Sequence, residues 1–293
     1  MYKAISANKR NTVLIMALFV GVISVIGWFV GYYYGDLNIA YVVFAVATIY
    51  ALIQYFAASK LSIIMTGARQ IEKRDNPRFY RIVENLSITI GSPMPKVYII
   101  DDSAPNAFAT GRDPRHAIVA ATSGLIDLMD DNELEAVMAH EMGHVQNYDI
   151  RLGMITFGLV SAIGLLSDVV LRMMFYGDRD NDNNNSSPVV LVVGIIALIL
   201  APIIAAVIQM AVSRQREYLA DATSAMTTRN PDSMISALRK LQTNGRPMAK
   251  QNASSAHLFF SNPLKAGSLG KLFSTHPPLE ERIARLQNNM NKF

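Results

Sequence analysis

The chain has 293 residues, of which 51% are hydrophobic and only 17% are charged, and its mean hydropathy is +0.22. Soluble domains contain about 25% charged residues, so this composition indicates a membrane protein. The absence of cysteine excludes disulfide bonds and cysteine-ligated zinc, and the modest net charge of +4 is explained by membrane topology before a nucleic-acid partner needs to be considered.

Two uncharged stretches near the N-terminus are long enough to cross a bilayer as helices. Residues 12–31 and residues 39–58 each provide about 20 residues without a charge, which as a helix spans roughly 30 Å of hydrocarbon. A cleaved signal peptide is a poor alternative for the first stretch, because the bulky aromatic residues 32–34 follow it. Lysine and arginine occur before the first stretch and after the second but not between them. The positive-inside rule therefore places residues 1–11 and residue 60 onward in the cytoplasm.

Residues 60–151 are expected to form the first half of a cytoplasmic domain. Asn76 followed by Pro77 is typical of an N-cap and the first residue of a helix. Three short stretches have the pattern of β-strands and could form a small sheet: residues 97–100, 106–111 and 117–120. A helix should follow them, with Asp131 or Asn132 as its N-cap.

Two further apolar stretches complete a predicted set of four transmembrane helices. Residues 152–171 form the weaker one, which could instead be a buried core helix, whereas residues 189–212 span easily with a kink expected at Pro202. The arginines that follow residue 212 indicate a return to the cytoplasm. The expected divisions are residues 1–59 (first two membrane helices), 60–151 (first half of the cytoplasmic domain), 152–212 (third and fourth membrane helices with the polar loop 172–188) and 213–293 (second half of the domain).

One motif combines possible metal ligands with a possible base: His140-Glu141-Met142-Gly143-His144, an HExxH sequence. On a helix, His140 and His144 leave the same face one turn apart, so both can bind one zinc ion. Glu141 can then act as general base toward a water molecule at the metal. Gly143 suggests that another backbone packs closely there. HExxH also arises by chance in amphipathic helices with surface histidines, so the motif needs support from the rest of the chain.

Two histidines leave a catalytic zinc site one protein ligand short, since such sites use three ligands plus water. Glu217 and Asp221 lie four residues apart on the expected helical continuation of residues 189–212. One carboxylate could bind the metal while the other holds a histidine ring from outside the coordination sphere. On their own, these two acids would be better explained as surface acids at a charged helix end.

Taken together, the motifs resemble the HtpX family of membrane-bound zinc metalloproteases, which are bacterial relatives of the CAAX prenyl proteases and of the Glu-zincin type. The resemblance rests on the HExxH sequence, on Glu217 with Asp221, and on the stretch FSTHPPLE at residues 273–280, and residues 106–111 resemble a further family motif. It covers nearly the whole chain, including four spans in the same order. It implies an α-helical membrane protein with four transmembrane helices and a mainly α (α+β), zincin-like cytoplasmic domain with a small β-sheet.

The resemblance also implies the members of the metal site. One zinc ion per chain would be bound by His140, His144 and Glu217, and this ligand set favours zinc over other divalent ions. Glu141 would be the general base. Asp221 would hold the ring of His140 from outside the coordination sphere.

Two more features are implied for substrate handling. His276 would stabilise the oxyanion of the tetrahedral intermediate, and such a donor contributes roughly 2.7–4 kcal/mol; from the sequence alone it could instead cap the terminal helix. An extended peptide would add to a sheet edge through main-chain hydrogen bonds. That edge comprises Asn106, Ala107, Phe108, Ala109, Thr110 and Gly111.

The implied function is a zinc metalloendopeptidase of the bacterial inner membrane, with both termini cytoplasmic, that cleaves misfolded or damaged membrane proteins in protein quality control and the stress response. Its partners would be membrane proteins or unfolded polypeptides as substrates, together with the lipid bilayer, and it would not bind nucleic acid. The oligomeric state is left open. A non-catalytic membrane adaptor is one alternative, which an intact Glu141 disfavours. An intramembrane-cleaving protease is another, which the acidic residues 130–135 disfavour, because each charge costs about 2.5–3.5 kcal/mol in hydrocarbon. His116 and His257 lie outside the motifs and are expected to be structural or surface residues.

Overall fold

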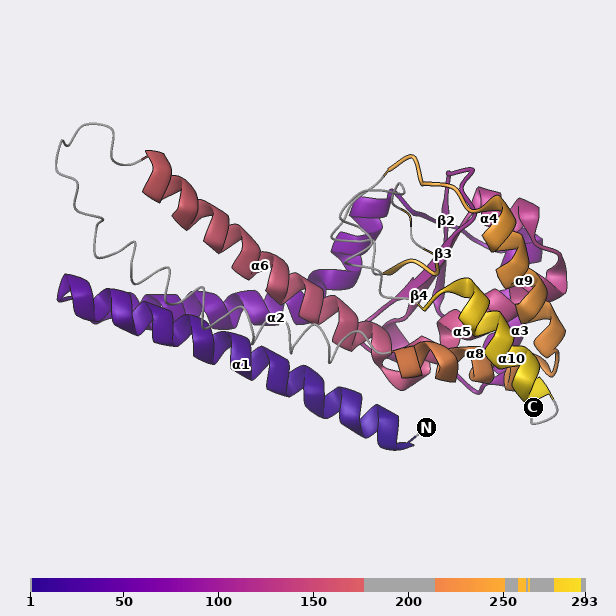
Figure 1. Cartoon of the computed structure of the whole chain (residues 1–293), viewed down its shortest axis with the longest axis horizontal. Coiled ribbons are helices and arrows are strands. Elements are labelled where there is room, and N and C mark those ends of the chain that lie inside the picture. The colour runs from indigo at the N-terminus through magenta and orange to yellow at the C-terminus, as the bar shows by residue number, and fades with distance from the viewer. Residues whose placement is uncertain (1, 177–213, 251–257, 262, 264–276, 291–293) are drawn as a thin grey trace.

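The computed structural model describes the whole chain except residues 1, 177–213, 251–257, 262, 264–276 and 291–293. Three long helices, α1, α2 and α6, form a stalk that projects from a mixed α/β body (Figure 1). The predicted fourth membrane helix and most of the polar loop before it lie outside the described residues. Helix α5, which contains the HExxH motif, leads directly into α6 of the stalk.

Helices α1 (Tyr2–Tyr34) and α2 (Asn38–Thr66) form a hairpin, and they are the helices in the described part of the chain that are long and apolar enough to cross a membrane. The predicted stretches 12–31 and 39–58 lie inside them. Helix α2 continues past the predicted end to Thr66 because Lys60 ends the apolar stretch without breaking the helix; the helix stops where Gly67 adopts a left-handed conformation.

Helix α6 (Asp149–Tyr176) packs along this hairpin. A cluster of buried side chains joins the three helices: Ile15, Phe19, Ala47, Ala51, Leu152, Ile155 and Leu159. The helix extends beyond the predicted end at residue 171, because residues 172–176 contain neither glycine nor proline. Residues 172–176, the predicted start of the loop, are therefore helical, and α6 belongs to the stalk from its first turns.

In the described part of the body, four strands form a mixed sheet in the order β1-β2-β4-β3. Strands β2 and β4 are parallel, and β3 pairs with β4 antiparallel at the edge of the sheet. The three predicted strands are confirmed with small shifts at their ends. The bounds are β1 Arg69–Gln70, β2 Lys96–Ile100, β3 Ala107–Thr110 and β4 Ile118–Thr122.

Helix α5 (Asp131–Asn147) contains the HExxH motif and runs through the middle of the body. Its apolar side chains, such as Leu134 and Met138, join the sheet and the neighbouring helices in one core. Because its central turns are covered on nearly all sides, polar residues there such as His140, Glu141 and His144 are buried as well. The helices and turn around it are α3 Pro77–Thr89, η1 Pro114–His116, α4 Ser123–Leu128, α8 Arg214–Thr228, α9 Pro231–Asn244 and α10 Leu279–Asn289.

The N-cap of α5 differs from the prediction. Asp130, rather than Asp131 or Asn132, accepts the backbone N–H of Glu133, and the Glu133 carboxylate accepts the N–H of Asp130 in return. This capping box satisfies two backbone donors at once, which a cap one residue later could not do with Glu133. The predicted cap of α3 by Asn76 is confirmed.

Candidate metal centre

The candidate centre lies between helices α5 and α8, which pack closely. Ser224 on α8 donates to the carbonyl oxygen of Ala136 on α5 over 2.6 Å. A Cβ atom added at Gly143 would lie 3.4 Å from Cγ2 of Thr223, which is ordinary contact and needs little adjustment. The small residue therefore faces α8, as the sequence suggested, and the two helices are near enough to present side chains to one point.

His140, His144 and Glu217 meet at that point. The two Nε2 atoms of the histidines are 3.1 Å apart, and the Glu217 carboxylate oxygens lie 3.4 Å from Nε2 of His144 and 3.7 Å from Nε2 of His140. One possible ligand atom from each residue lies within 4.8 Å of the others, and all three residues are buried. These are the three residues that the sequence analysis named as metal ligands.

The chemistry of these donors fits a bound cation. Nδ1 of His140 is 2.9 Å from Oδ1 of Asp221, and Nδ1 of His144 is 3.1 Å from Oδ2 of Asp149. A neutral imidazole that donates through Nδ1 directs the lone pair of Nε2 the other way. Two such lone pairs and a carboxylate facing one another repel unless a proton or metal ion lies between them. Carboxylate–histidine pairs behind the ligands are typical of zinc sites.

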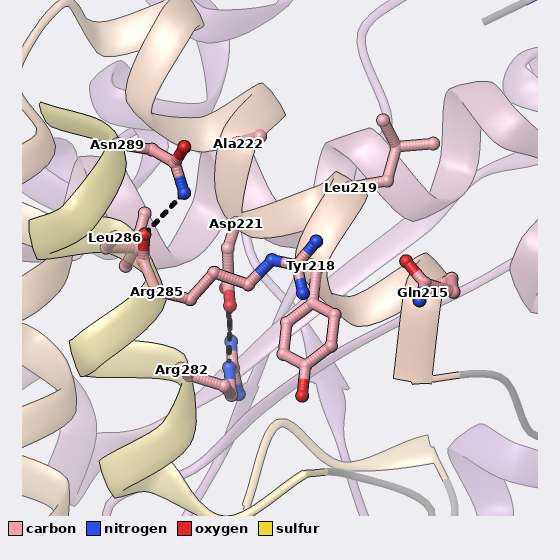
Figure 2. Close-up of a pocket in the computed structure, with 9 residues that line it drawn as sticks. All are labelled: Gln215, Tyr218, Leu219, Asp221, Ala222, Arg282, Arg285, Leu286 and Asn289. Carbon is pink, nitrogen blue, oxygen red and sulfur yellow. Dashed lines mark hydrogen bonds and ion pairs between the residues drawn. The ribbon is translucent and has the colours of Figure 1, made fainter. Parts of the chain in front are cut away.

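Asp221 is itself held by Arg282 of α10. The Nε and Nη2 atoms of Arg282 donate to the two Asp221 oxygens over 2.9 and 2.6 Å, and both side chains are almost wholly buried. Figure 2 shows this pair at the wall of a pocket of about 450 Å³ between α8 and α10, whose lining does not include the three candidate ligands. The sequence analysis missed Arg282. The available signal was a charged residue beside Ile283 and Leu286 on the apolar face of an amphipathic helix.

The electrostatics of the centre favour the protonation states that metal binding needs at His140. Burial lowers the pKa of His140 to about 4, despite its hydrogen bond to Asp221. Burial alone would raise the pKa of Asp221, but Arg282 and His140 lower it to about 2. At neutral pH the ring is therefore neutral and the carboxylate ionised.

His144 behaves differently in the absence of a metal ion. Burial alone would lower its pKa, but the charges of Glu217 and Asp149 outweigh burial and raise the pKa above the ordinary value. In the metal-free protein a proton on His144 thus compensates the two carboxylates. A metal ion at the same point would replace that proton.

Glu141 follows His140 on α5 and is buried beside the ligands. His276 and His257 lie outside the described residues. His116 lies on the surface in η1, where its side chain contacts Asp113, consistent with the expectation that it is not part of the centre. Phe260 packs edge-on against the His140 ring with 4.9 Å between the ring centres.

The predicted substrate edge, residues 106–111, includes strand β3 at the margin of the sheet. Part of its outer side is occupied by the chain itself. The backbone N–H of Phe260 donates to the carbonyl oxygen of Ala107 over 2.8 Å, and Phe259 forms an antiparallel bridge with Phe108. A peptide that used this part of the edge would have to replace Phe259 and Phe260.

The two ends of the predicted edge have structural contacts of their own. The Asn106 side chain accepts from the backbone N–H of Ser261 and donates to its carbonyl oxygen, over 3.0 and 2.8 Å. Gly111 has φ +146°, and a Cβ atom there would lie 2.7 Å from the carbonyl oxygen of His116. Only glycine fits that turn without strain.

Comparison with known proteins identifies the family. Residues 73–290 match the sequence model described as "Peptidase family M48". The chain belongs to this family. Over 293 residues it is 54% identical to the "Protease HtpX homolog" of Tropheryma whipplei (strain Twist), covering 100% of both chains. It is 44% identical over 296 residues to the "Protease HtpX homolog" of Streptococcus gordonii, covering 98% of this chain and 99% of the relative.

A solved structure shares the fold. S. mikatae Ste24p superposes with a TM-score of 0.53 at 20% identity, over 93% of this chain and 62% of that chain. The M48 chain described here thus spans 62% of the length of Ste24p. The family and the HtpX relatives show that the chain is a membrane-bound metalloprotease, and a non-catalytic adaptor is not favoured.

Proposed function

We propose that this M48 chain is a zinc-dependent endopeptidase with His140, His144 and Glu217 as the metal ligands. The observation that supports this most is the convergence of the Nε2 atoms of two histidines and one carboxylate, with a carboxylate beside the Nδ1 atom of each ring. A zinc ion held there supplies Lewis-acid activation of water and of the scissile carbonyl group.

The remaining chemistry belongs to the side chains. Glu141 accepts the proton of the attacking water and delivers a proton to the amine nitrogen as the peptide bond breaks. Asp221 keeps the proton of His140 on Nδ1, so that Nε2 stays available to the metal. His276 is assigned to the oxyanion by the family resemblance alone.

The decisive experiment compares Glu141→Ala with Glu135→Ala, a half-buried glutamate on the same helix. The Glu141 variant should retain one zinc per chain and lose peptidase activity, because Glu141 acts on water and is not a ligand. The Glu135 variant should retain both. Loss of zinc from the Glu141 variant, or peptidase activity that survives in it, would reject the assigned role.

We further propose four membrane spans with both termini in the cytoplasm of a bacterial cell, and substrates that are membrane proteins undergoing quality control. The ligand-bearing helix α5 leads into α6, whose Leu152 already lies in the core of the stalk. The metal centre is thus next to the membrane helices, where anchored substrates gain effective concentration by confinement.

A spacer series tests this placement. One cleavable segment is fused at increasing distance from a membrane anchor, and a soluble version is compared with it. Anchored segments with short spacers should be cut fastest. Equal rates for the soluble version, with no effect of spacer length, would refute the substrate proposal while leaving peptidase activity itself intact.

For peptide docking, we propose that an extended substrate takes the place of Phe259 and Phe260 beside Ala107. Main-chain hydrogen bonds along a sheet edge are a common mode of peptide recognition. Phe259→Ala removes the ring that packs on Phe108, and should lower KM for an extended peptide with little change in kcat. A higher KM would show that Phe259 helps to bind substrate.

A further inference from the structure

The first turns of α1 contact the corner between α5 and α6. Helix α5 ends at Asn147, Tyr148 adopts a left-handed conformation with φ 61°, and α6 begins at Asp149. A non-glycine residue in this conformation is strained and needs support from its surroundings. Two cations contact the Tyr148 side chain: Nζ of Lys9 lies 4.4 Å and Cζ of Arg151 lies 4.8 Å from its ring centre.

Asn8 on α1 bridges that corner. Its Nδ2 atom donates to the carbonyl oxygen of Asn147 over 2.8 Å and to Oδ1 of Asp149 over 2.6 Å. Both partners are acceptors, so the amide nitrogen and not its oxygen must face them. Asn8, Asn147 and Asp149 are all buried. The one side chain therefore joins the last residue of the HExxH helix to the first residue of α6.

The bridge continues to the metal centre. Asp149 uses its other oxygen, Oδ2, to accept the Nδ1 proton of His144 over 3.1 Å. Arg216 Nη1 lies 3.8 Å from the Oδ1 atom that Asn8 contacts. The Oδ1 atom of Asp149 thus lies beside Asn8 and Arg216, and its Oδ2 atom faces the His144 ring. A change in its position would turn the His144 ring away from the point shared with His140.

We propose that Asn8 is a positioning residue for the metal ligand His144, acting through Asp149, so that the cytoplasmic end of the first membrane helix forms an outer part of the metal centre. The inference rests on the proposed function in that it places a metal ion at His144. Asn8 lies in the positively charged segment before the first apolar stretch. Outer hydrogen-bond partners of this kind typically change metal affinity by about 10–100-fold.

The test uses the full-length protein in detergent, with zinc affinity measured by chelator competition. Asn8→Ala should weaken zinc binding by about 10-fold, which is the lower end of the range for residues outside the coordination sphere. Asn8→Asp should weaken it more, because a second carboxylate then faces Asp149. Asn11→Ala changes a half-buried asparagine one turn further along α1 and should bind zinc like the unchanged protein. In the cobalt-substituted protein, the visible spectrum should shift in the Asn8 variants alone.

A double-mutant cycle separates positioning from general destabilisation. If Asn8 acts through Asp149, then Asn8→Ala should have no further effect on zinc affinity in an Asp149→Ala background. Equal losses in both backgrounds, or zinc affinity and a cobalt spectrum unchanged by Asn8→Ala and Asn8→Asp, would overturn the proposal. If the wild-type protein bound zinc but cleaved no peptide, the proposed function would be rejected. The double-mutant cycle on zinc affinity would still test the role of Asn8.

Discussion

Replacing Arg282 by methionine should destabilise the protein strongly. The guanidinium makes two hydrogen bonds to Asp221 in a site where both side chains are almost fully removed from solvent. Breaking a buried pair by removing one partner leaves an uncompensated charge and costs about 3–5 kcal/mol. For a chain of this size each kcal/mol shifts Tm by about 2–4 °C, so Tm should fall by roughly 6–20 °C.

The same change should weaken the metal centre. Arg282 is one cause of the low pKa values of both His140 and Asp221. Without it, His140 is more easily protonated, and a protonated ring cannot bind zinc. We therefore expect zinc affinity to fall by about 10–100-fold together with Tm, and more steeply at pH 6 than at pH 8.

Thermal unfolding of the full-length protein in detergent, with and without zinc, measures the first effect, and chelator competition measures the second. The matched control is Arg285→Met, which removes an exposed arginine whose guanidinium lies 4.2 Å from the Tyr218 ring centre. An exposed contact of this kind contributes about 0.5–1 kcal/mol, so Tm should change little. Combining Asp221→Asn with Arg282→Met removes the buried charge and should recover much of the lost Tm. The reasoning would be refuted if Arg282→Met lowered Tm no more than the control Arg285→Met does.

Three further outcomes are expected. Glu217→Ala should abolish zinc binding, whereas Asp221→Ala should weaken it by only about 10–100-fold; the opposite order would reverse their roles. Burial alone lowers the pKa of His144, but the neighbouring carboxylates raise it above its ordinary value, so the metal-free protein is protonated there at neutral pH. Zinc binding should then release about one proton and become tighter as pH rises. Calorimetry in two buffers of different ionisation enthalpy measures the number of protons released per zinc bound, and a value near zero would contradict this expectation. A reporter fused after the last residue should be cytoplasmic and one in residues 183–187 should be on the far side; a cytoplasmic signal from the loop would contradict the four-span topology.

The sequence by itself determined those features whose signals are local. The spacing of His140 and His144 matches the helical period, so both rings leave α5 on one face. Asn76 before Pro77 marks the start of α3, and the apolar stretches mark the helices of the stalk, because capping and hydrophobic burial depend on neighbours a few residues away. Glu217 was found only with the help of a family resemblance, since a lone acid at a helix end has no distinctive pattern.

Only the tertiary structure decided what surrounds the ligands. Asn8 behind Asp149 and Arg282 behind Asp221 lie 141 and 61 residues away from the acids that they contact. Asp149 is near His144 in sequence, but it faces the ring only because the chain turns at Tyr148 between α5 and α6. None of them repeats with the period of a helix or strand, and each would be an ordinary polar residue in isolation. Their role follows from burial, because a charged group or an amide that is removed from water needs a hydrogen-bond partner. That partner must be close in the folded structure, but it can lie anywhere in the sequence.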